Sequence, residues 1–242
     1  MKKKVLLLSA ITMMAMCALA QAQQRTRSSY VNPMIGTAGM GHTFPGACSP
    51  FGIVQLSPET DTIPQNVDGK YQTEVYSYCA GYQYDDPTIV GFSHTHLSGT
   101  GCVDLLDVMM QPSVEPITRL QGEDLYPATF SHDNEKASVG YYAVRFDGSG
   151  INTELTATTR TGMTRITYPA GKPQTLAFDM SHAGQNRGGD RKTIIFNSQL
   201  RLVNATTLVG YRMLSGWQKA RKVYFYAQFS RPVVAKTVRQ GK

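Results

Sequence analysis

The sequence predicts an all-β protein, an antiparallel β-sandwich with long irregular N-terminal loops. Helical periodicity is nearly absent, and short runs of alternating apolar and polar residues recur about every ten residues. Gly, Pro, His and aromatic residues crowd the region 30–101. The composition of the 242 residues, 41% hydrophobic and 17% charged, is that of a globular protein and excludes collagenous and disordered chains.

The N-terminus has the layout of a cleavable secretory signal. Three lysines at 2–4 precede an apolar core from Val5 to Ala20, and the small residues Ala20 and Ala22 suit cleavage after Ala22. We therefore expect a signal peptide at 1–22, a secreted or periplasmic mature chain at 23–242, and no membrane span after cleavage. A retained N-terminal anchor is the alternative. The mature part has three cysteines, which permit at most one internal disulfide.

The loop-rich region from Tyr30 to Gly101 comes first and shows little alternation. Binding residues concentrate in such loops, so function is expected there. The stretch Gly36–Gly41 has three glycines, but neither Lys-Ser/Thr nor a helical pattern follows. A tight irregular loop is predicted there rather than a phosphate-binding loop.

Regular strands are expected further along the chain. Tyr141–Phe146 leads through the turn residues 147–150 into Ile151–Thr158, a pattern that predicts a hairpin with one buried face. Short antiparallel strands of this kind stack as a sandwich. Further strands are predicted at Met163–Tyr168, Leu176–Met180, Thr193–Val203, Thr207–Leu214 and Val223–Phe229.

Charge is distributed unevenly along the chain. Residues 23–186 carry 9 basic and 16 acidic side chains, whereas residues 187–242 carry 12 basic side chains and one acidic one, Asp190. The cations are spread singly through strand-like sequence, so nucleic-acid binding is not expected. A basic face that packs on an acidic neighbour is the remaining hypothesis. It predicts one basic patch beside the loop-rich region.

The most unusual stretch is Gly91–Cys102, which contains His94 and His96. Two residues apart, these side chains project to one face of an extended backbone. They suit either two ligands of a metal ion or buried, hydrogen-bonded histidines that fix a polar pocket wall. Ser98 does not stand in the Gly-x-Ser-x-Gly spacing of a nucleophile elbow, so no nucleophile is predicted there.

Four carboxylates are candidates for glycosidic chemistry. Hydrolysis needs an acid and a base about 6.5–9.5 Å apart for inversion, or about 5–5.5 Å apart for retention. The sequence spacing singles out no such pair, and no catalytic residue is predicted in this chain. The four carboxylates are Asp85, Asp86, Asp104 and Asp107.

An ordered set of motifs covers essentially the whole mature chain. In this order the motifs resemble the N-terminal domain of glycoside hydrolase family 92, the bacterial calcium-dependent exo-α-mannosidases. The motifs are Tyr30–Thr37, Gly41–Ala47, Pro50–Pro58, Cys79–Tyr84, Gly91–Cys102, Ser138–Tyr142, Glu154–Thr158, Gly210–Arg212 and Ser215–Trp217.

The resemblance implies a two-domain, inverting enzyme. In the family a β-sandwich packs on a C-terminal (α/α)6 barrel, which supplies the general acid, the general base and the calcium ligands. We therefore expect the chain to be the N-terminal part of a secreted α-mannosidase of the α-1,2 type, acting on mannose-containing glycans. Its partner would be the barrel, or a separately encoded equivalent. Without the barrel, the chain is expected to be inactive and to hold no metal.

The resemblance also assigns substrate-binding residues to the sugar-facing wall. Ala80, Gln83 and Asp85 depart from the family's Cys-Ser-Gly-Tyr-His-Tyr-Ser-Asp pattern, and we expect them to alter hydrogen bonding to the sugar. The expected substrate-binding residues are His42, Thr43, Phe44 and Pro45; Cys79, Gly81 and Tyr82; His94, His96, Ser98 and Thr100; and Asp104.

Two other functions remain open from the sequence. A stand-alone carbohydrate-binding sandwich would present a flat, exposed row of Trp and Tyr, although Trp217 is the only tryptophan in the chain. A secreted structural or adhesion module would instead show a self-complementary apolar face, with the histidines buried.

Overall fold

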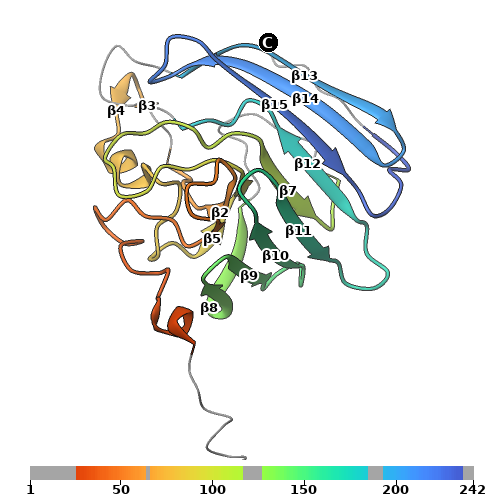
Figure 1. The fold of residues 1–242 in the computed structure, drawn as a ribbon, viewed down its shortest axis with the longest axis horizontal. Helices are drawn as coiled ribbons and strands as arrows, with labels where there is room; N and C mark the ends of the chain where they lie inside the picture. The colour runs from red at the N-terminus through yellow and green to blue at the C-terminus, as the bar shows by residue number, and fades with distance from the viewer. Residues whose placement is uncertain (1–25, 64–65, 117–126, 185–192, 237–242) are drawn as a thin grey trace, which may run out of the picture. The chain divides into compact units, whose positions relative to one another are not determined.

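The structure is a computed structural model that describes residues 26–63, 66–116, 127–184 and 193–236 (Figure 1). The predicted signal peptide lies outside these residues. The chain divides into two compact units, residues 1–32 and 33–242. In the first unit the described part holds the short 3-10 helix η1 (Arg27–Tyr30). The sheets and the candidate site described below lie in the second unit.

The described residues are almost entirely strands and loops. Every strand pairing is antiparallel, which confirms the predicted all-β class. No described helix is long and apolar enough to cross a membrane. The elements are β1 (Ala47–Cys48), β2 (Gln55–Glu59), β3 (Asn66–Val67), β4 (Lys70–Tyr71), η2 (Thr73–Tyr78), β5 (Thr88–Ile89), β6 (Gly91–Ser93), β7 (Met109–Ser113), β8 (Ala128–Ser138), β9 (Tyr141–Phe146), β10 (Asn152–Ala157), β11 (Gly162–Thr167), β12 (Thr175–Asp179), β13 (Ile194–Asn204), β14 (Thr207–Ser215) and β15 (Arg221–Gln228).

The strands form three main sheets and one small hairpin. The first sheet has the order β1-β2-β6-β7-β12, the second β11-β10-β9-β8-β5 and the third β13-β14-β15, while β3 and β4 pair alone. In Figure 1 the strands β7 and β12 of the first sheet lie between the third sheet and the strands β9 to β11. The first sheet is therefore the middle layer.

The predicted strands from residue 141 onward are all present, with ends that differ by one or two residues. The long strand β8 was not among the predictions. Its sequence is polar, and its pairing with β9 is interrupted between Phe130 and Glu135. A strand with that interruption and little apolar alternation gives no period-2 signal.

The hydrophobic core lies between the first and second sheets. From β9, Tyr142, Val144 and Phe146 alternate inward and are at most 2% exposed. Phe92 of β6 meets Phe146 with ring centroids 6.1 Å apart, which joins the two layers. Burial of these large side chains supplies most of the driving force for the sandwich.

Charged side chains join the third sheet to the segment that precedes β7 of the first sheet. Arg212 of β14 is fully buried, and its Nε lies 3.6 Å from Oδ1 of Asp107. Arg221 of β15 donates to Oδ1 of Asp104 at 3.1 Å and also to Oδ2 of Asp107. We call these four residues the arginine–aspartate cluster. Burial lowers the pKa of Arg212, an effect that the neighbouring Asp107 opposes.

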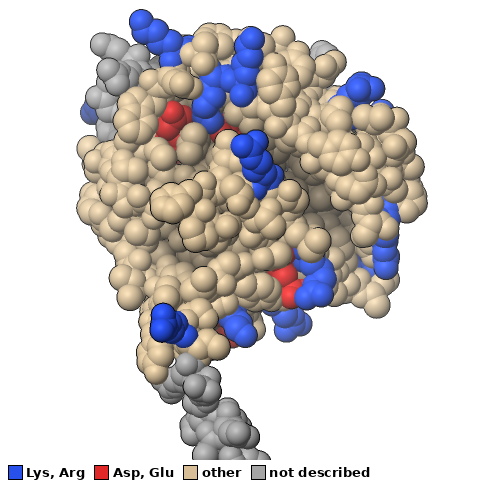
Figure 2. Space-filling model, viewed as in Figure 1, with Lys and Arg blue, Asp and Glu red and all other residues tan. Residues whose placement is uncertain are grey.

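The basic C-terminal segment thus finds acidic partners inside its own chain. Arg212 and Arg221 pair with aspartates of the acidic part, which accounts for some of the charge asymmetry. Figure 2 shows Lys and Arg side chains at several separate places on the visible face rather than in one patch. This distribution counts against the single basic patch that the sequence suggested.

The arginine–aspartate cluster is expected to contribute to the stability of the fold. Replacing Arg212 by Met removes a buried cation and leaves Asp107 with one guanidinium partner instead of two. We expect Arg212→Met to lower the free energy of unfolding by about 3 kcal/mol in urea titrations. Arg201→Met, an exposed arginine of the same sheet, is the matched control and should change it by less than about 0.5 kcal/mol. Equal effects of the two substitutions would contradict the assignment.

Candidate functional site

Two loops and the 3-10 helix η2 of the N-terminal third meet at His42. The Gly99 amide donates to the His42 carbonyl at 2.6 Å, and the Tyr76 ring meets the imidazole edge to face at a centroid distance of 5.1 Å. A Cβ at Gly101 would lie 2.0 Å from the Tyr76 hydroxyl, so a larger residue there would displace the Tyr76 side chain. His42, Tyr76, Ser98 and Thr100 are called the His42 junction below.

His42 has the strongest indication of a ligand-binding role in this junction. His42 is only 6% exposed, and its Nε2 is a buried atom without a hydrogen-bond partner. Leaving such an atom unsatisfied costs about 1–3 kcal/mol, so a native structure normally provides a partner, a water or a ligand. Its backbone also has φ of +51°, a region that non-glycine residues seldom occupy.

The hydroxyl groups of the junction are more accessible. Tyr76 is 43% exposed and Ser98 is exposed, while Thr100 is half-buried and accepts from the Cys102 amide at 3.2 Å. An imidazole nitrogen and several hydroxyls can both donate and accept hydrogen bonds. The junction therefore suits a neutral, hydroxyl-rich ligand.

The residues after His42 support the loop. Thr43 donates through Oγ1 to the Ile35 carbonyl at 2.9 Å, and Pro45 is buried. The Phe44 ring lies 4.8 Å from the His96 ring. The Phe44 ring thus joins the His42 loop to a buried polar network around His96.

His96 is the centre of that network. Its Nδ1 donates to the Gln55 carbonyl at 2.7 Å, so a proton is fixed on Nδ1. Its Nε2 lies 2.9 Å from Oε1 of Glu59 and 3.1 Å from Oγ of Ser93, and Ser93 also donates to Glu59. Ser93 and Glu59 both bind the same ring nitrogen, and Ser93 is fully buried. This network therefore lacks the relay through two ring nitrogens that activates a serine nucleophile.

The predicted residues Cys79, Gly81 and Tyr82 are buried away from the junction's exposed hydroxyls. Cys79 donates to the Tyr76 carbonyl at 3.0 Å, and Gly81 has φ of +84°. A Cβ at Gly81 would lie 2.0 Å from Oε2 of Glu59, so glycine is required by both conformation and space. The cysteines of the described chain, Cys48, Cys79 and Cys102, are thiols and form no disulfide.

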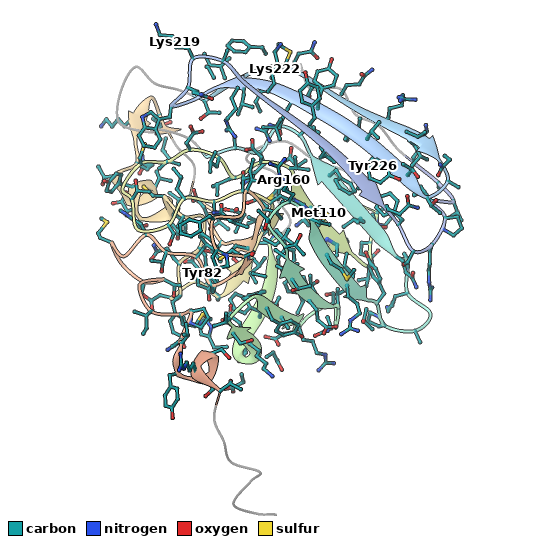
Figure 3. The ribbon with its side chains drawn as sticks, viewed as in Figure 1. Tyr82, Met110, Arg160, Lys219, Lys222 and Tyr226 are labelled. Carbon is teal, nitrogen blue, oxygen red and sulfur yellow. The ribbon has the colours of Figure 1, made fainter. Side chains whose placement is uncertain are left out.

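Tyr82 belongs to the sandwich core, where Figure 3 labels it. It is 1% exposed, and its hydroxyl donates to Glu135 at 3.0 Å. The Tyr142 hydroxyl donates to the same carboxylate at 2.6 Å. Burial, reinforced by Glu135, raises the pKa of both tyrosines, which stay neutral donors. Tyr82 thus serves the packing of β8 and β9 in this arrangement.

His94 and His96 do not converge on one point. His94 is half-buried, and its Nδ1 donates to the Val108 carbonyl at 2.7 Å, whereas His96 binds Gln55 and Glu59. Among the described residues no group of three or more His, Cys, Asp or Glu could hold a metal ion. Of the two interpretations, the hydrogen-bonded histidines match the contacts of this pair.

Asp86 and Asp104 both accept hydrogen bonds from other protein groups. Asp104 is 4% exposed and accepts from Arg221 and from the Trp217 amide, the latter at 2.9 Å. Asp86 accepts from the Tyr78 hydroxyl at 3.1 Å, while Asp85 is exposed. Asp104 therefore contributes to the arginine–aspartate cluster rather than to the His42 junction.

Gln83, which departs from the family pattern and was expected to alter hydrogen bonding to the sugar, bonds to protein carbonyls instead, whereas Glu59 and Tyr76 carried no clear signal in the sequence. Gln83 is buried, and its amide donates to the Gly39 carbonyl at 3.0 Å and to the Ser77 carbonyl, joining two loops. Glu59 and Tyr76 act through partners far away in sequence. Arg212 alone had a usable signal, because it occupies an inward position in an alternating strand, where a cation requires a buried partner.

The comparisons with known proteins agree with this architecture. Residues 30–242 match the family described as glycosyl hydrolase family 92 N-terminal domain. A family GH92 α-mannosidase from Bacteroides thetaiotaomicron, solved with mannoimidazole, is 37% identical, with a TM-score of 0.73. The match covers 86% of this chain and 26% of that one. The fold and the sequence therefore define a β-domain of the kind found in family GH92 proteins.

Two further relatives extend the comparison. The GH92 family glycosyl hydrolase ccman5 is 27% identical, with a TM-score of 0.65, over 82% of this chain and 26% of its own. A secreted glycosidase from Arthroderma benhamiae, described as uncharacterized, is 32% identical over 58% of this chain and 17% of its own length. The chain thus spans about a quarter or less of these relatives. It belongs to the glycosyl hydrolase family 92 N-terminal domain family.

The burial of His94 predicts that the stability of the chain depends on pH. Burial holds the pKa of His94 below its ordinary value of 6.5, so the folded chain favours the neutral ring and the unfolded chain takes up the proton more readily. The neutral His94 ring contributes its full share to the free energy of unfolding above about pH 6.5. This contribution is lost as the pH falls below that value, and its size is about 1.4 kcal/mol per unit of difference between the folded and unfolded pKa.

Urea titrations between pH 7.5 and 5 measure this effect. The free energy of unfolding should fall more steeply with acid in the unmodified chain than in His94→Asn, whose amide can still donate to the Val108 carbonyl. Parallel pH curves for the two proteins would show that His94 is not the responsible group.

Proposed function

We propose that the chain is the N-terminal part of a secreted or periplasmic, inverting α-mannosidase of the α-1,2 type, acting on mannose-containing glycans. Support comes from membership of family 92 over residues 30–242 and from the 37% identity to an α-mannosidase. The relative named as a secreted glycosidase supports export, as does the signal-like sequence at 1–22.

The His42 junction is the proposed sugar-facing wall. The unpartnered Nε2 of His42 carries this assignment, because a sugar hydroxyl would satisfy the buried nitrogen. Tyr76, Ser98 and Thr100 would orient neighbouring hydroxyls. The Gly99 amide bond to the His42 carbonyl holds the two loops in register, so these groups are positioned before the sugar arrives.

The chemistry itself is assigned to another domain. Glu59 is bound to His96 and Ser93, and Asp104 and Asp107 to arginines, so these buried carboxylates are not placed to protonate a leaving group or activate water. We propose that the acid and base belong to a C-terminal (α/α)6 barrel, in the same chain or encoded separately. The present chain would bind and orient the sugar and exclude water from it.

Calcium, the cofactor that the family resemblance implies, would supply a cation to coordinate sugar hydroxyls. The described residues do not fit such a site. They contain no candidate ligand cluster, and the buried Asp104 and Asp107 already pair with guanidinium groups. We therefore assign the calcium ligands to the barrel and derive no step through the ion.

A chimeric enzyme tests this proposal. Replacing the corresponding domain of the Bacteroides α-mannosidase by this chain should give an enzyme that hydrolyses α-1,2-mannobiose with calcium present, whereas the chain alone should show no turnover. His42→Ala in the chimera should lower kcat/KM about 10- to 100-fold, because a sugar hydroxyl loses its buried partner.

The matched control is His132→Ala. His132 stacks on Tyr84 at a centroid distance of 3.9 Å and binds Glu135, neither of which belongs to the His42 junction, so activity should be unchanged. Turnover by the chain alone would contradict the assignment of the chemistry to the barrel. An active chimera in which His42→Ala has no effect would contradict the assignment of the sugar wall.

A further inference from the structure

The third sheet has an outer face that no described segment covers. On β15 the inward side chains pack on the first sheet, where Phe225 stacks on Phe178 of β12 at 6.2 Å. The alternate side chains point away from it, and Tyr224 and Tyr226 are 69% and 66% exposed. Adjacent exposed aromatic rings form a contiguous apolar surface, which is a feature of interaction sites.

Cross-strand pairing gathers the rings into one surface. Tyr224 lies opposite Tyr211 of β14, with ring centroids 5.9 Å apart, and Tyr226 lies opposite Val209. Positions two apart on a strand are about 6.5–7 Å apart along it, so Tyr224 and Tyr226 form adjacent platforms. The Tyr226 hydroxyl donates to Oε1 of Gln228 at 2.8 Å, which restrains its ring.

Polar and cationic groups share this face. Lys222 begins the same outward row of β15, and Arg201 and Gln199 of β13 pair with Val209 and Tyr211 of β14. Figure 3 labels Lys219, Lys222 and Tyr226 on this part of the ribbon. Residues 193–236 contain seven Lys or Arg and no Asp or Glu, so no carboxylate of this segment neutralises the exposed cations. We call Gln199, Arg201, Tyr211, Lys222, Tyr224, Tyr226 and Gln228 the tyrosine–lysine face.

We propose that the tyrosine–lysine face binds an anionic glycan, a sugar chain that carries carboxylate, sulfate or phosphate groups. Tyrosine rings offer flat faces for the apolar side of pyranose rings. The amides of Gln199 and Gln228 can bond hydroxyls, and Arg201 and Lys222 can pair with the anionic groups. The site lies on the third sheet, whereas the His42 junction is built from loops and η2, and it does not depend on the proposed mannosidase function.

Isothermal titration calorimetry with the complete chain tests the proposal, with polygalacturonate as the anionic glycan and yeast mannan as the neutral one. We expect polygalacturonate to bind and neutral mannan to bind at least tenfold more weakly. Tyr224→Ala and Tyr226→Ala should each weaken binding about tenfold. Lys222→Ala should weaken it and reduce its salt dependence. Tyr30→Ala and Lys172→Ala, exposed residues outside this sheet, are the matched controls and should bind as the unmodified chain does.

Poly-L-glutamate separates a glycan from an acidic protein. Equal binding of poly-L-glutamate and polygalacturonate, insensitive to the tyrosine substitutions, would overturn the proposal in favour of a non-specific acidic partner. Absence of polygalacturonate binding would also overturn it. Circular dichroism melting curves check that each variant is folded, and the substitutions are expected to leave the curves unchanged because these side chains are exposed.

Discussion

The constraint on which the structure depends most is the pairing of the buried Arg212 and the half-buried Arg221 with two buried aspartates. Arg212 and Arg221 come from the third sheet, and Asp104 and Asp107 from the segment before β7. A buried charge without a partner is very costly, so the third sheet and this segment must come together. The pairing thus sets the position of an outer layer as well as that of a loop.

Residues 94–100 connect the arginine–aspartate cluster to the His42 junction. Thr95 donates to Asp107 at 2.8 Å, and the Asp107 amide donates back to Thr95 at 3.0 Å. Residues 94–100 are therefore fixed at one end by the arginine–aspartate cluster. At the other end, Gly99 binds the His42 carbonyl. The position of the proposed sugar wall thus depends on ion pairs that lie outside it. A substitution of Arg212 should therefore change the conformation of residues 94–100 as well as the free energy of unfolding.

Local sequence predicts one half of this protein better than the other. The strands after residue 141 alternate regularly, and their bounds are correct to within two residues. The N-terminal third has no such period, because its backbone is held by individual contacts such as Gly81 against Glu59. Such contacts join residues far apart in the chain, so spacing alone cannot reveal them. Of the expected site, His42, Ser98 and Thr100 lie in the loops that meet at the junction, whereas Tyr82 lies in the core.

The central claim is that this domain shapes a sugar site whose proton-transferring groups lie elsewhere. The most direct measurement is a crystal structure of the Bacteroides chimera with mannoimidazole bound. The claim predicts that His42 Nε2 lies within hydrogen-bonding distance of a sugar hydroxyl and that both carboxylates flanking the reacting carbon come from the barrel. A structure in which both carboxylates come from this chain, or in which the sugar lies away from His42, would contradict it.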